Sequence, residues 1–173
     1  MYTHGKAELE RTCSTIVATC ACFSVRVASR AVTRFYDSVL APSGLRATQF
    51  AVIVGVFRGF GTTLTVLGRE LGMDRTSLSR NLRPLLHRGF VTAVRPTDRR
   101  RRAFQTTKRG ERLLVQTIPY WDKAQQHVVA TVGAEKWATL NGELRSLAEA
   151  IRFGAADHVA IGLEARPLNG RRQ

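Results

Sequence analysis

Cysteine is scarce in this chain of 173 residues, and its three copies, Cys13, Cys20 and Cys22, lie close together. Because no distant cysteine could pair with them, a disulfide-stabilised scaffold is not expected. No cysteine or histidine pair has the spacing of a zinc site, so we expect neither a metal nor a cofactor. The sequence also lacks a secretory signal and an apolar run of about 18 residues. We therefore expect a cytoplasmic protein.

Motifs of the common enzyme classes are missing as well. The sequence contains no serine-hydrolase, P-loop, zinc-enzyme or dinucleotide-binding motif. The four histidines, His4, His87, His127 and His158, do not cluster with acidic residues in the sequence. The chain is therefore not expected to be an enzyme.

Acidic residues are few: 13 Asp and Glu stand against 27 Lys and Arg, which gives a net charge of +14. Such an excess attracts polyanions, and nucleic acid is the commonest reason for it. An anionic membrane and a merely solvated basic surface are the alternatives. A membrane-binding helix would need a basic face beside a broad apolar one, whereas the basic residues here gather on a short helix and a hairpin.

Apolar spacing predicts helices in the first part of the chain. Residues from about 9 to 40 are predicted to form one long helix, which ends before the breaker residues 42–44. A second helix starts at about Thr48 and is closed by Gly59 and Gly61. The apolar face of this second helix contains Phe50, Ile53, Val54, Phe57 and Phe60.

Two short helices joined by a tight turn at residues 72–73 follow. Thr65 and Asp74 are the expected N-caps of these helices, and residues 87–89 end the second one. The apolar stripe of the first helix contains Leu64, Leu67 and Leu71. The apolar stripe of the second contains Leu78, Leu82, Leu85 and Leu86.

Beyond Gly89 the pattern becomes that of strands. Residues 90–94 and 103–106 predict a β-hairpin. Thr107 is the expected N-cap of a further helix over about 108–131, which Pro119 should interrupt. The sequence is therefore predicted to be mostly α-helical with one small hairpin.

The last predicted helix spans about 134–153 and follows Gly133. It has a coiled-coil-like seam of apolar residues. The seam consists of Trp137, Leu140, Leu144, Leu147 and Ile151. Residues 154–173 are predicted to form a basic, flexible tail.

The second short helix turns arginines and hydroxyls to solvent once its leucines point inward. Arg can form paired hydrogen bonds to guanine in the major groove, and Ser and Thr can contact bases or phosphates. This face contains Arg75, Thr76, Ser77, Ser79, Arg80 and Arg83, and Thr65 is a further candidate DNA contact. Pro84 is expected to kink the rear of the helix, beyond the residues that would read bases.

The hairpin tip is rich in arginine. Adjacent arginines repel one another unless a polyanion neutralises them, and on DNA one or two can enter a narrow minor groove while the others follow phosphates. The candidate residues are Arg95, Asp98, Arg99, Arg100, Arg101 and Arg102. A helix-turn-helix followed by such a hairpin is a winged helix-turn-helix, a DNA-binding fold.

In order and spacing, these elements resemble the multiple-antibiotic-resistance regulator (MarR) family over about residues 13–152. The resemblance rests on residues 44–50, 64–72, 75–80, 85–89 and 98–100, and on Thr107 and Gly110. Thr106 departs from the family, which usually has leucine there. Arg100 matches the arginine of the family's wing tip.

The resemblance implies a triangular homodimer with entwined first and last helices. Residues 1–45 and 111–153 would then serve dimerisation, 46–110 would form the DNA-binding domain, and 154–173 the tail. The expected partner is a pseudo-palindromic operator in double-stranded DNA. The expected function is that of a transcriptional regulator, a repressor released by a small-molecule or oxidative signal. A non-specific DNA-binding or chromosome-architecture protein is the alternative.

Two kinds of signal remain open. Similar regulators respond to small aromatic or phenolic ligands, and the candidate pocket residues here are Phe23, Val27, Arg30, Phe50, Ile53, Phe57, Tyr120 and Trp121. Each of these could equally be an ordinary core residue. The stretch around Cys22 resembles the hydroperoxide-sensing branch of the family, with Tyr36 at one of its tyrosine positions and Ala47 at the other. Arg26, one turn away, would support a reactive Cys22, whose alternative is a small buried side chain.

Overall fold

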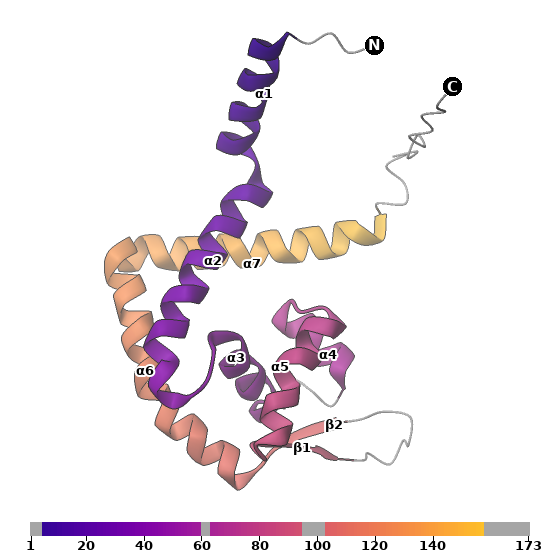
Figure 1. The fold of residues 1–173 in the computed structure, drawn as a ribbon, viewed down its shortest axis with the longest axis vertical. Helices are drawn as coiled ribbons and strands as arrows, with labels where there is room; N and C mark the ends of the chain where they lie inside the picture. The colour runs from indigo at the N-terminus through magenta and orange to yellow at the C-terminus, as the bar shows by residue number, and fades with distance from the viewer. Residues whose placement is uncertain (1–4, 60–62, 95–102, 158–173) are drawn as a thin grey trace. The chain divides into compact units, whose positions relative to one another are not determined.

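The computed structural model describes residues 5–59, 63–94 and 103–157, with side-chain surroundings up to Ile151 (Figure 1). Contacts divide the chain into two units, Met1–Gln125 and Gln126–Gln173. The first unit contains helices α1 to α5, the two strands and most of α6. The second unit contains the end of α6 and α7.

The predicted first helix is in fact two helices, α1 (Lys6–Thr19) and α2 (Ala21–Leu40). Cys20 between them is extended, with ψ 115°, yet its N–H still donates to the Ile16 carbonyl and its own carbonyl accepts from the Ser24 N–H. The prediction of one helix was wrong because an apolar repeat continues through a single extended residue, and no proline or glycine marks the break.

The break also bears on membrane insertion. Within the described ranges, no single helix is long and apolar enough to cross a membrane. Only α1 and α2 taken together, up to Ser43, pass that test by length and composition, and they are bent by 54° at the break.

Helix α3 (Ala47–Phe57) follows a short 3-10 turn, Ala41–Ser43, and Gly44, whose φ is 69°. Two side chains take up N–H groups at the start of α3. The Arg46 N–H donates to Oε1 of Gln49 at 3.0 Å, and the Ala47 N–H donates to Oδ1 of Asp37 at 2.7 Å. The predicted second helix is confirmed, although Phe57 is 58% exposed and so lies off its buried face. Phe60 and Gly61 lie outside the described residues.

Helices α4 (Leu64–Leu71) and α5 (Arg75–His87) form the predicted pair. Thr63 caps α4, since its hydroxyl accepts from the Val66 N–H at 3.3 Å. The predicted cap, Thr65, lies inside the helix, so that prediction was wrong by two residues. Thr63 directly precedes the leucine stripe and Thr65 directly follows its first leucine, so the stripe alone does not show which threonine is the cap. Asp74 caps α5 as predicted, accepting from the Ser77 N–H at 2.8 Å.

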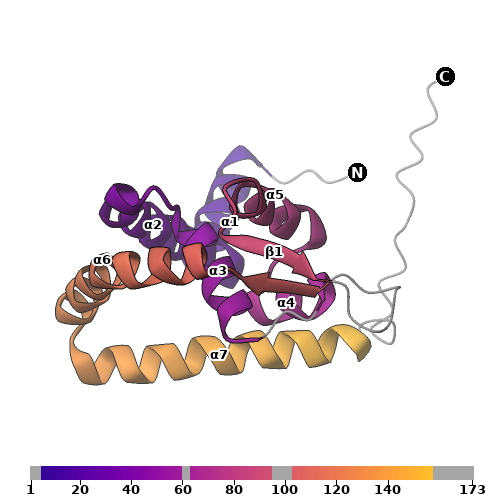
Figure 2. The same cartoon turned by 90° about the horizontal axis from the view of Figure 1, so that it is seen from below.

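Strands β1 (Val91–Val94) and β2 (Ala103–Thr106) pair antiparallel, with Val91 opposite Thr106 and Val94 opposite Ala103. The predicted hairpin is thereby confirmed. Figure 2 shows the two strands near α3 and α5, and the contacts are between β1 and α5 and between β2 and α3. The Thr106 hydroxyl is buried without a hydrogen-bond partner among the described residues.

Helix α6 (Lys108–Val132) runs through Pro119, so the predicted interruption is wrong. Proline removes the N–H that would bond the carbonyl four residues earlier, here that of Val115. Because Val115 is 70% exposed, water can hydrate that carbonyl and the helix continues. Helix α5 likewise contains Pro84 and still extends to His87; the kink expected there remains a prediction.

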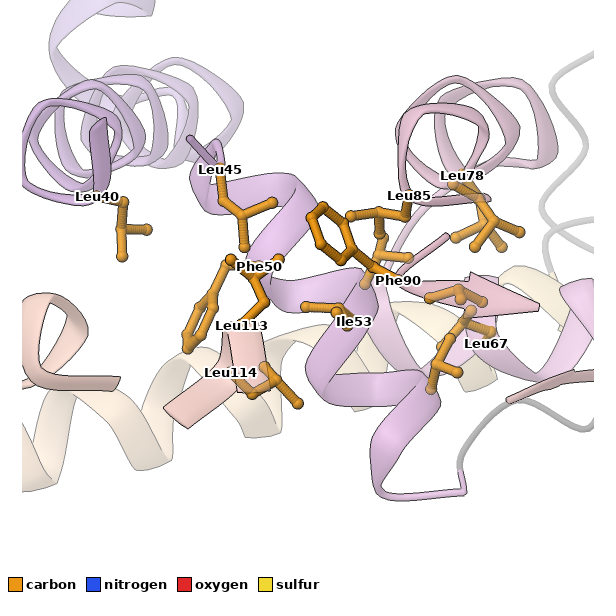
Figure 3. Packing of buried hydrophobic residues seen from close by; sticks show 14 residues of the cluster. Leu40, Leu45, Phe50, Ile53, Leu67, Leu78, Leu85, Phe90, Leu113 and Leu114 are labelled. Carbon is orange, nitrogen blue, oxygen red and sulfur yellow. The ribbon is translucent and has the colours of Figure 1, made fainter. Parts of the chain in front are cut away.

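The core of the first unit is built around α3 (Figure 3). Phe50 and Ile53 of this helix lie between Leu40 and Leu45 on one side and Leu67 of α4 with the leucines of α5 on the other. Burial of each such side chain contributes about 1.5–3 kcal/mol. Helix α3 is therefore the element against which α4 and α5 are held.

The hairpin and α6 meet at a close backbone contact. The Phe90 carbonyl accepts from the N–H of Thr107 at 3.0 Å and from its hydroxyl at 3.3 Å. Thr107 also caps α6, as predicted, by accepting from the Gly110 N–H at 3.1 Å. A Cβ at Gly110 would overlap the Phe90 carbonyl oxygen. Glycine at this position thus allows the hairpin base to touch the first turn of α6.

In the second unit, α7 (Ala134–Asp157) follows Gly133, whose φ is 92°. The helix extends four residues beyond its predicted end at residue 153. Four apolar residues of the predicted seam are between 40% and 59% exposed. These are Leu140, Leu144, Leu147 and Ile151. The remaining predicted tail, residues 158–173, lies outside the described residues.

We expect Gly110→Ala to lower the free energy of unfolding by about 1–3 kcal/mol, because its methyl group would meet backbone atoms that cannot move aside cheaply. Gly142→Ala on α7 is the matched control, since a Cβ there would have no neighbour within 4 Å. That control should gain about 0.5–1 kcal/mol through helix propensity. Urea unfolding of the two variants measures the difference, and similar values for both would contradict the close contact.

Candidate nucleic-acid interface

The exposed face of α5 follows from the side it buries. Leu78, Leu82 and Leu85 are at most 2% exposed, which turns the opposite side of the helix to solvent. Five of the predicted DNA contacts on α5 are exposed: Arg75, Thr76, Ser79, Arg80 and Arg83. No carboxylate of the described residues forms an ion pair with these three arginines. Their charges are thus available to a polyanion.

Ser77 has a different role from its neighbours on α5. It is half-buried, and its hydroxyl donates to Oδ2 of Asp74 at 2.7 Å while its N–H donates to Oδ1. These two hydrogen bonds, the backbone one first, hold the pKa of Asp74 below its ordinary value. In the structure the Ser77 hydroxyl is bonded to the N-cap of α5. A DNA contact by Ser77 stays a prediction from the sequence.

The turn between α4 and α5 is tight because two glycines permit close packing. Gly72 adopts φ 62°, and the Met73 N–H donates to the Gly68 carbonyl at 2.8 Å. A Cβ at Gly68 would lie 2.8 Å from the Met73 carbonyl oxygen. The turn therefore places α5 close across α4, as the helix-turn-helix requires. Thr65 is exposed in the first turn of α4.

The hairpin brings residues 94 and 103 opposite each other. The candidate contacts between them lie outside the described residues. These are Arg95, Asp98, Arg99, Arg100, Arg101 and Arg102. They remain a prediction from the sequence.

Two arginines near the hairpin base were not singled out as anchors by the sequence. Nη1 of Arg88 donates to the Gly44 carbonyl at 2.9 Å, and its guanidinium lies 4.7 Å from the centre of the Phe90 ring. The guanidinium of Arg109 lies 5.2 Å from the same ring. The Arg88–Gly44 and Arg109–Phe90 contacts each join residues that are far apart in the sequence, so no local pattern identifies them.

The candidate pocket residues fall into different environments. Phe50 and Ile53 are buried in the core, and Tyr120 and Trp121 are partly buried against it. Three others are well exposed: Phe23 by 47%, Val27 by 65% and Phe57 by 58%. Arg30 on α2 is exposed as well. The first two are thus core residues of the single chain, while those on α2 face solvent.

The redox candidates are not brought together within the chain. Cys22 is exposed, and Nη2 of Arg26 lies 3.6 Å from its sulfur. Tyr36 is on the same helix about 21 Å further along at 1.5 Å per residue, and its hydroxyl donates to Oε1 of Gln125 at 2.7 Å. Burial raises the pKa of Tyr36.

Potential metal ligands are dispersed in the part of the chain that the structure covers. No three His, Cys, Asp or Glu residues there lie close enough together to hold a metal ion.

Similarity to known proteins is found among solved structures. No protein-family model matches the chain, and no curated protein does. The transcriptional regulator MosR of M. tuberculosis, solved in complex with DNA, is 31% identical with a TM-score of 0.69, over 77% of this chain and 96% of MosR.

Two further structures share the fold at lower identity. CouR from Rhodococcus jostii RHA1, solved with p-coumaroyl-CoA, is 22% identical with a TM-score of 0.65, over 76% of this chain and 94% of CouR. A MarR mutant from E. coli, solved with operator DNA, is 22% identical with a TM-score of 0.67, over 76% of this chain and 96% of MarR.

We expect Arg80→Lys to reduce the preference for a selected DNA sequence over a random one by about 5- to 100-fold. Lysine keeps the charge but cannot form the paired hydrogen bonds of a guanidinium, each worth about 1–3 kcal/mol of base discrimination. Fluorescence anisotropy with both duplexes measures the ratio. Lys123→Ala, an exposed change on α6, is the control and should leave the ratio unchanged. An unaltered ratio in Arg80→Lys would remove Arg80 from the base-reading set.

Proposed function

The chain belongs to the MarR family of winged helix-turn-helix transcriptional regulators, and on this premise we propose how it binds and releases DNA. It is a sequence-specific regulator of double-stranded DNA, and its relatives are regulators, not enzymes. As a homodimer acting in the cytoplasm, it would place α5 of each protomer in the major groove of a pseudo-palindromic operator. Arginines of the hairpin tip would enter the minor groove, and a signal would release the repressor.

One observation carries the proposal: α5 buries its leucines and exposes arginines and hydroxyls on its outer side, and no carboxylate of the described residues pairs with those arginines. A buried arginine without a partner would be costly, so this face is suited to solvent or to a polyanion. MosR and MarR were solved with DNA, which supports the same use here. A net charge of +14 also favours a second candidate, non-specific DNA binding, because charge alone attracts any duplex.

Selection of duplexes from a random-sequence library separates these two functions. The regulator should enrich one two-half-site sequence and bind it at least 10³-fold tighter than random DNA at moderate salt. Non-specific DNA binding would enrich none.

Arg100→Ala should weaken binding and lower the slope of log affinity against log salt by about 0.9, the value for one lost phosphate contact. An unchanged slope would refute the role of the wing tip.

The exposed seam of α7 supports a dimer. Leucines along one face that are 40–42% exposed in the single chain would become buried against a partner helix. Apolar residues that are exposed on α1 and α2 likewise support a place for these two helices in the dimer interface. They include Leu9, Ile16, Val17, Phe23 and Val27.

Truncation before Glu135 should therefore abolish dimerisation, as measured by sedimentation equilibrium. Leu144→Asp should have the same effect, because each buried leucine contributes about 1.5–3 kcal/mol and the dimer would lose two. Ser146→Asp adds the same charge on the opposite side of α7 and is the control. If the Leu144 variant stays as dimeric as the Ser146 variant, the seam is not the interface.

Two signals are proposed for release. CouR was solved with p-coumaroyl-CoA, which supports a small aromatic or phenolic ligand beside α2. The exposed thiol of Cys22, which lies 3.6 Å from a guanidinium nitrogen, supports oxidation instead. A hydroperoxide would transfer one oxygen to the thiolate, forming a sulfenic acid and releasing an alcohol or water.

Cys22→Ser should keep DNA affinity and lose the response to hydroperoxide. Cys13→Ser changes another exposed cysteine, on α1; it is the control and should respond like the natural chain. The readout is the DNA-bound fraction in an anisotropy titration with cumene hydroperoxide. Continued release of DNA by the Cys22 variant would exclude this thiol as the sensor and leave the ligand.

A further inference from the structure

Leucine burial alone leaves the exact orientation of α5 loosely fixed. The hydrophobic effect is non-directional, so an apolar stripe tolerates small rotations and shifts of a helix. Paired hydrogen bonds to base edges require groups held within about 0.5 Å and 10–20° of their proper geometry. A directional contact between α5 and the core helix α3 would supply that precision.

Thr48 and Asn81 make such a contact. The Thr48 hydroxyl, in the first turn of α3, donates to Oδ1 of Asn81 at 2.8 Å. Nδ2 of Asn81 donates to the Ser77 carbonyl one turn earlier in α5, also at 2.8 Å. Asn81 therefore joins the first turn of α3 to the front half of α5.

Both ends of the Asn81 amide are satisfied, which defines its orientation. If the amide were flipped, its oxygen would face the Ser77 carbonyl oxygen, and both groups only accept hydrogen bonds. Ser77 in turn donates to both carboxylate oxygens of Asp74. The hydrogen bonds thus run from α3 to the N-cap of α5 without a gap.

The other end of this series of bonds reaches α2. Oδ1 of Asp37 on α2 accepts from the Ala47 N–H, the residue before Thr48. Asp37, Thr48 and Asn81 are all partly buried. Together they form a polar bridge from α2 through the start of α3 to α5, which we call the α2–α3–α5 bridge.

We propose that Thr48 and Asn81 are positioning residues, which hold α5 at the rotation and height that base reading requires; this rests on the proposed function. Neither side chain is assigned a DNA contact. They act on Arg75 and Arg80 through the orientation of the helix that carries them. Loss of the bond therefore reduces sequence discrimination and leaves the attraction of the charges for any duplex unchanged.

The first test compares Thr48→Val with Thr48→Ser, using the duplex that the natural chain selects and a random duplex of equal length. Valine keeps the shape and removes the hydroxyl, whereas serine keeps the donor. Thr48→Val should bind the selected duplex 3- to 10-fold more weakly, with random-duplex affinity and salt slope unchanged. Thr48→Ser should remain within twofold of the natural chain. Equal losses on both duplexes, or no loss, would overturn the proposal.

The second test is a double-mutant cycle. Asn81→Ala should lose a similar factor, and Thr48→Val combined with Asn81→Ala should lose little more than Asn81→Ala alone. Two changes that remove the same bond are not additive. If the losses multiply, the two side chains act separately and the bridge is not the cause.

The third test needs no DNA and so separates failure of this inference from failure of the proposed function. Amide hydrogen exchange in α5 should be at least threefold faster in Thr48→Val than in Thr48→Ser, while exchange in the first half of α6 stays the same. If the natural chain selects no sequence but exchange changes as stated, the bridge holds α5 and the regulator function fails. Unchanged exchange overturns the bridge itself.

Discussion

Burial of three leucines of α5 against the core decides which side of that helix meets solvent. Leu78, Leu82 and Leu85 are buried in the core around α3. The arginines between them in the sequence therefore lie on the opposite, solvent-exposed side of the helix. Turning the helix over would expose the leucines and bury unpaired guanidinium groups, and both changes are unfavourable. The side of α5 that meets solvent is therefore a consequence of how its leucines pack in the core.

Hydrogen bonds between polar groups fix the orientation of the helices more precisely than the packing of the core does. Asp74 and Thr107 each cap a helix, and each side chain makes a further hydrogen bond. Asp74 accepts from the Ser77 hydroxyl in the first turn of α5, and the Thr107 hydroxyl donates to the carbonyl groups of Gly89 and Phe90, just before β1. Such bonds contribute about 0.5–1.5 kcal/mol each, less than a buried leucine, but they depend on direction. The leucines hold the elements together, and the hydrogen bonds set their angles.

The sequence predicted most elements because their signals are local. The leucine stripes, Asp74 at the start of α5 and Thr107 at the start of α6 are each visible within one turn. The break at Cys20 and the continuity of α6 through Pro119 escaped prediction, because one depends on a single backbone torsion and the other goes with the exposure of Val115, four residues before the proline. The Thr48–Asn81 bond joins residues 33 positions apart, and both read as ordinary polar positions. Apolar spacing likewise could not separate buried Ile53 from exposed Val27.

Thr106 is a position where the packing of the domain is energetically unfavourable. Its buried hydroxyl has no partner among the described residues, beside the point where β2 reaches α6. Desolvating an unsatisfied hydroxyl costs about 1–3 kcal/mol, so an aliphatic residue of the same shape would suit the site better. Since Thr106 is not among the candidate DNA contacts, this is a position where the domain could be stabilised for use in a biosensor without changing a residue proposed to contact DNA.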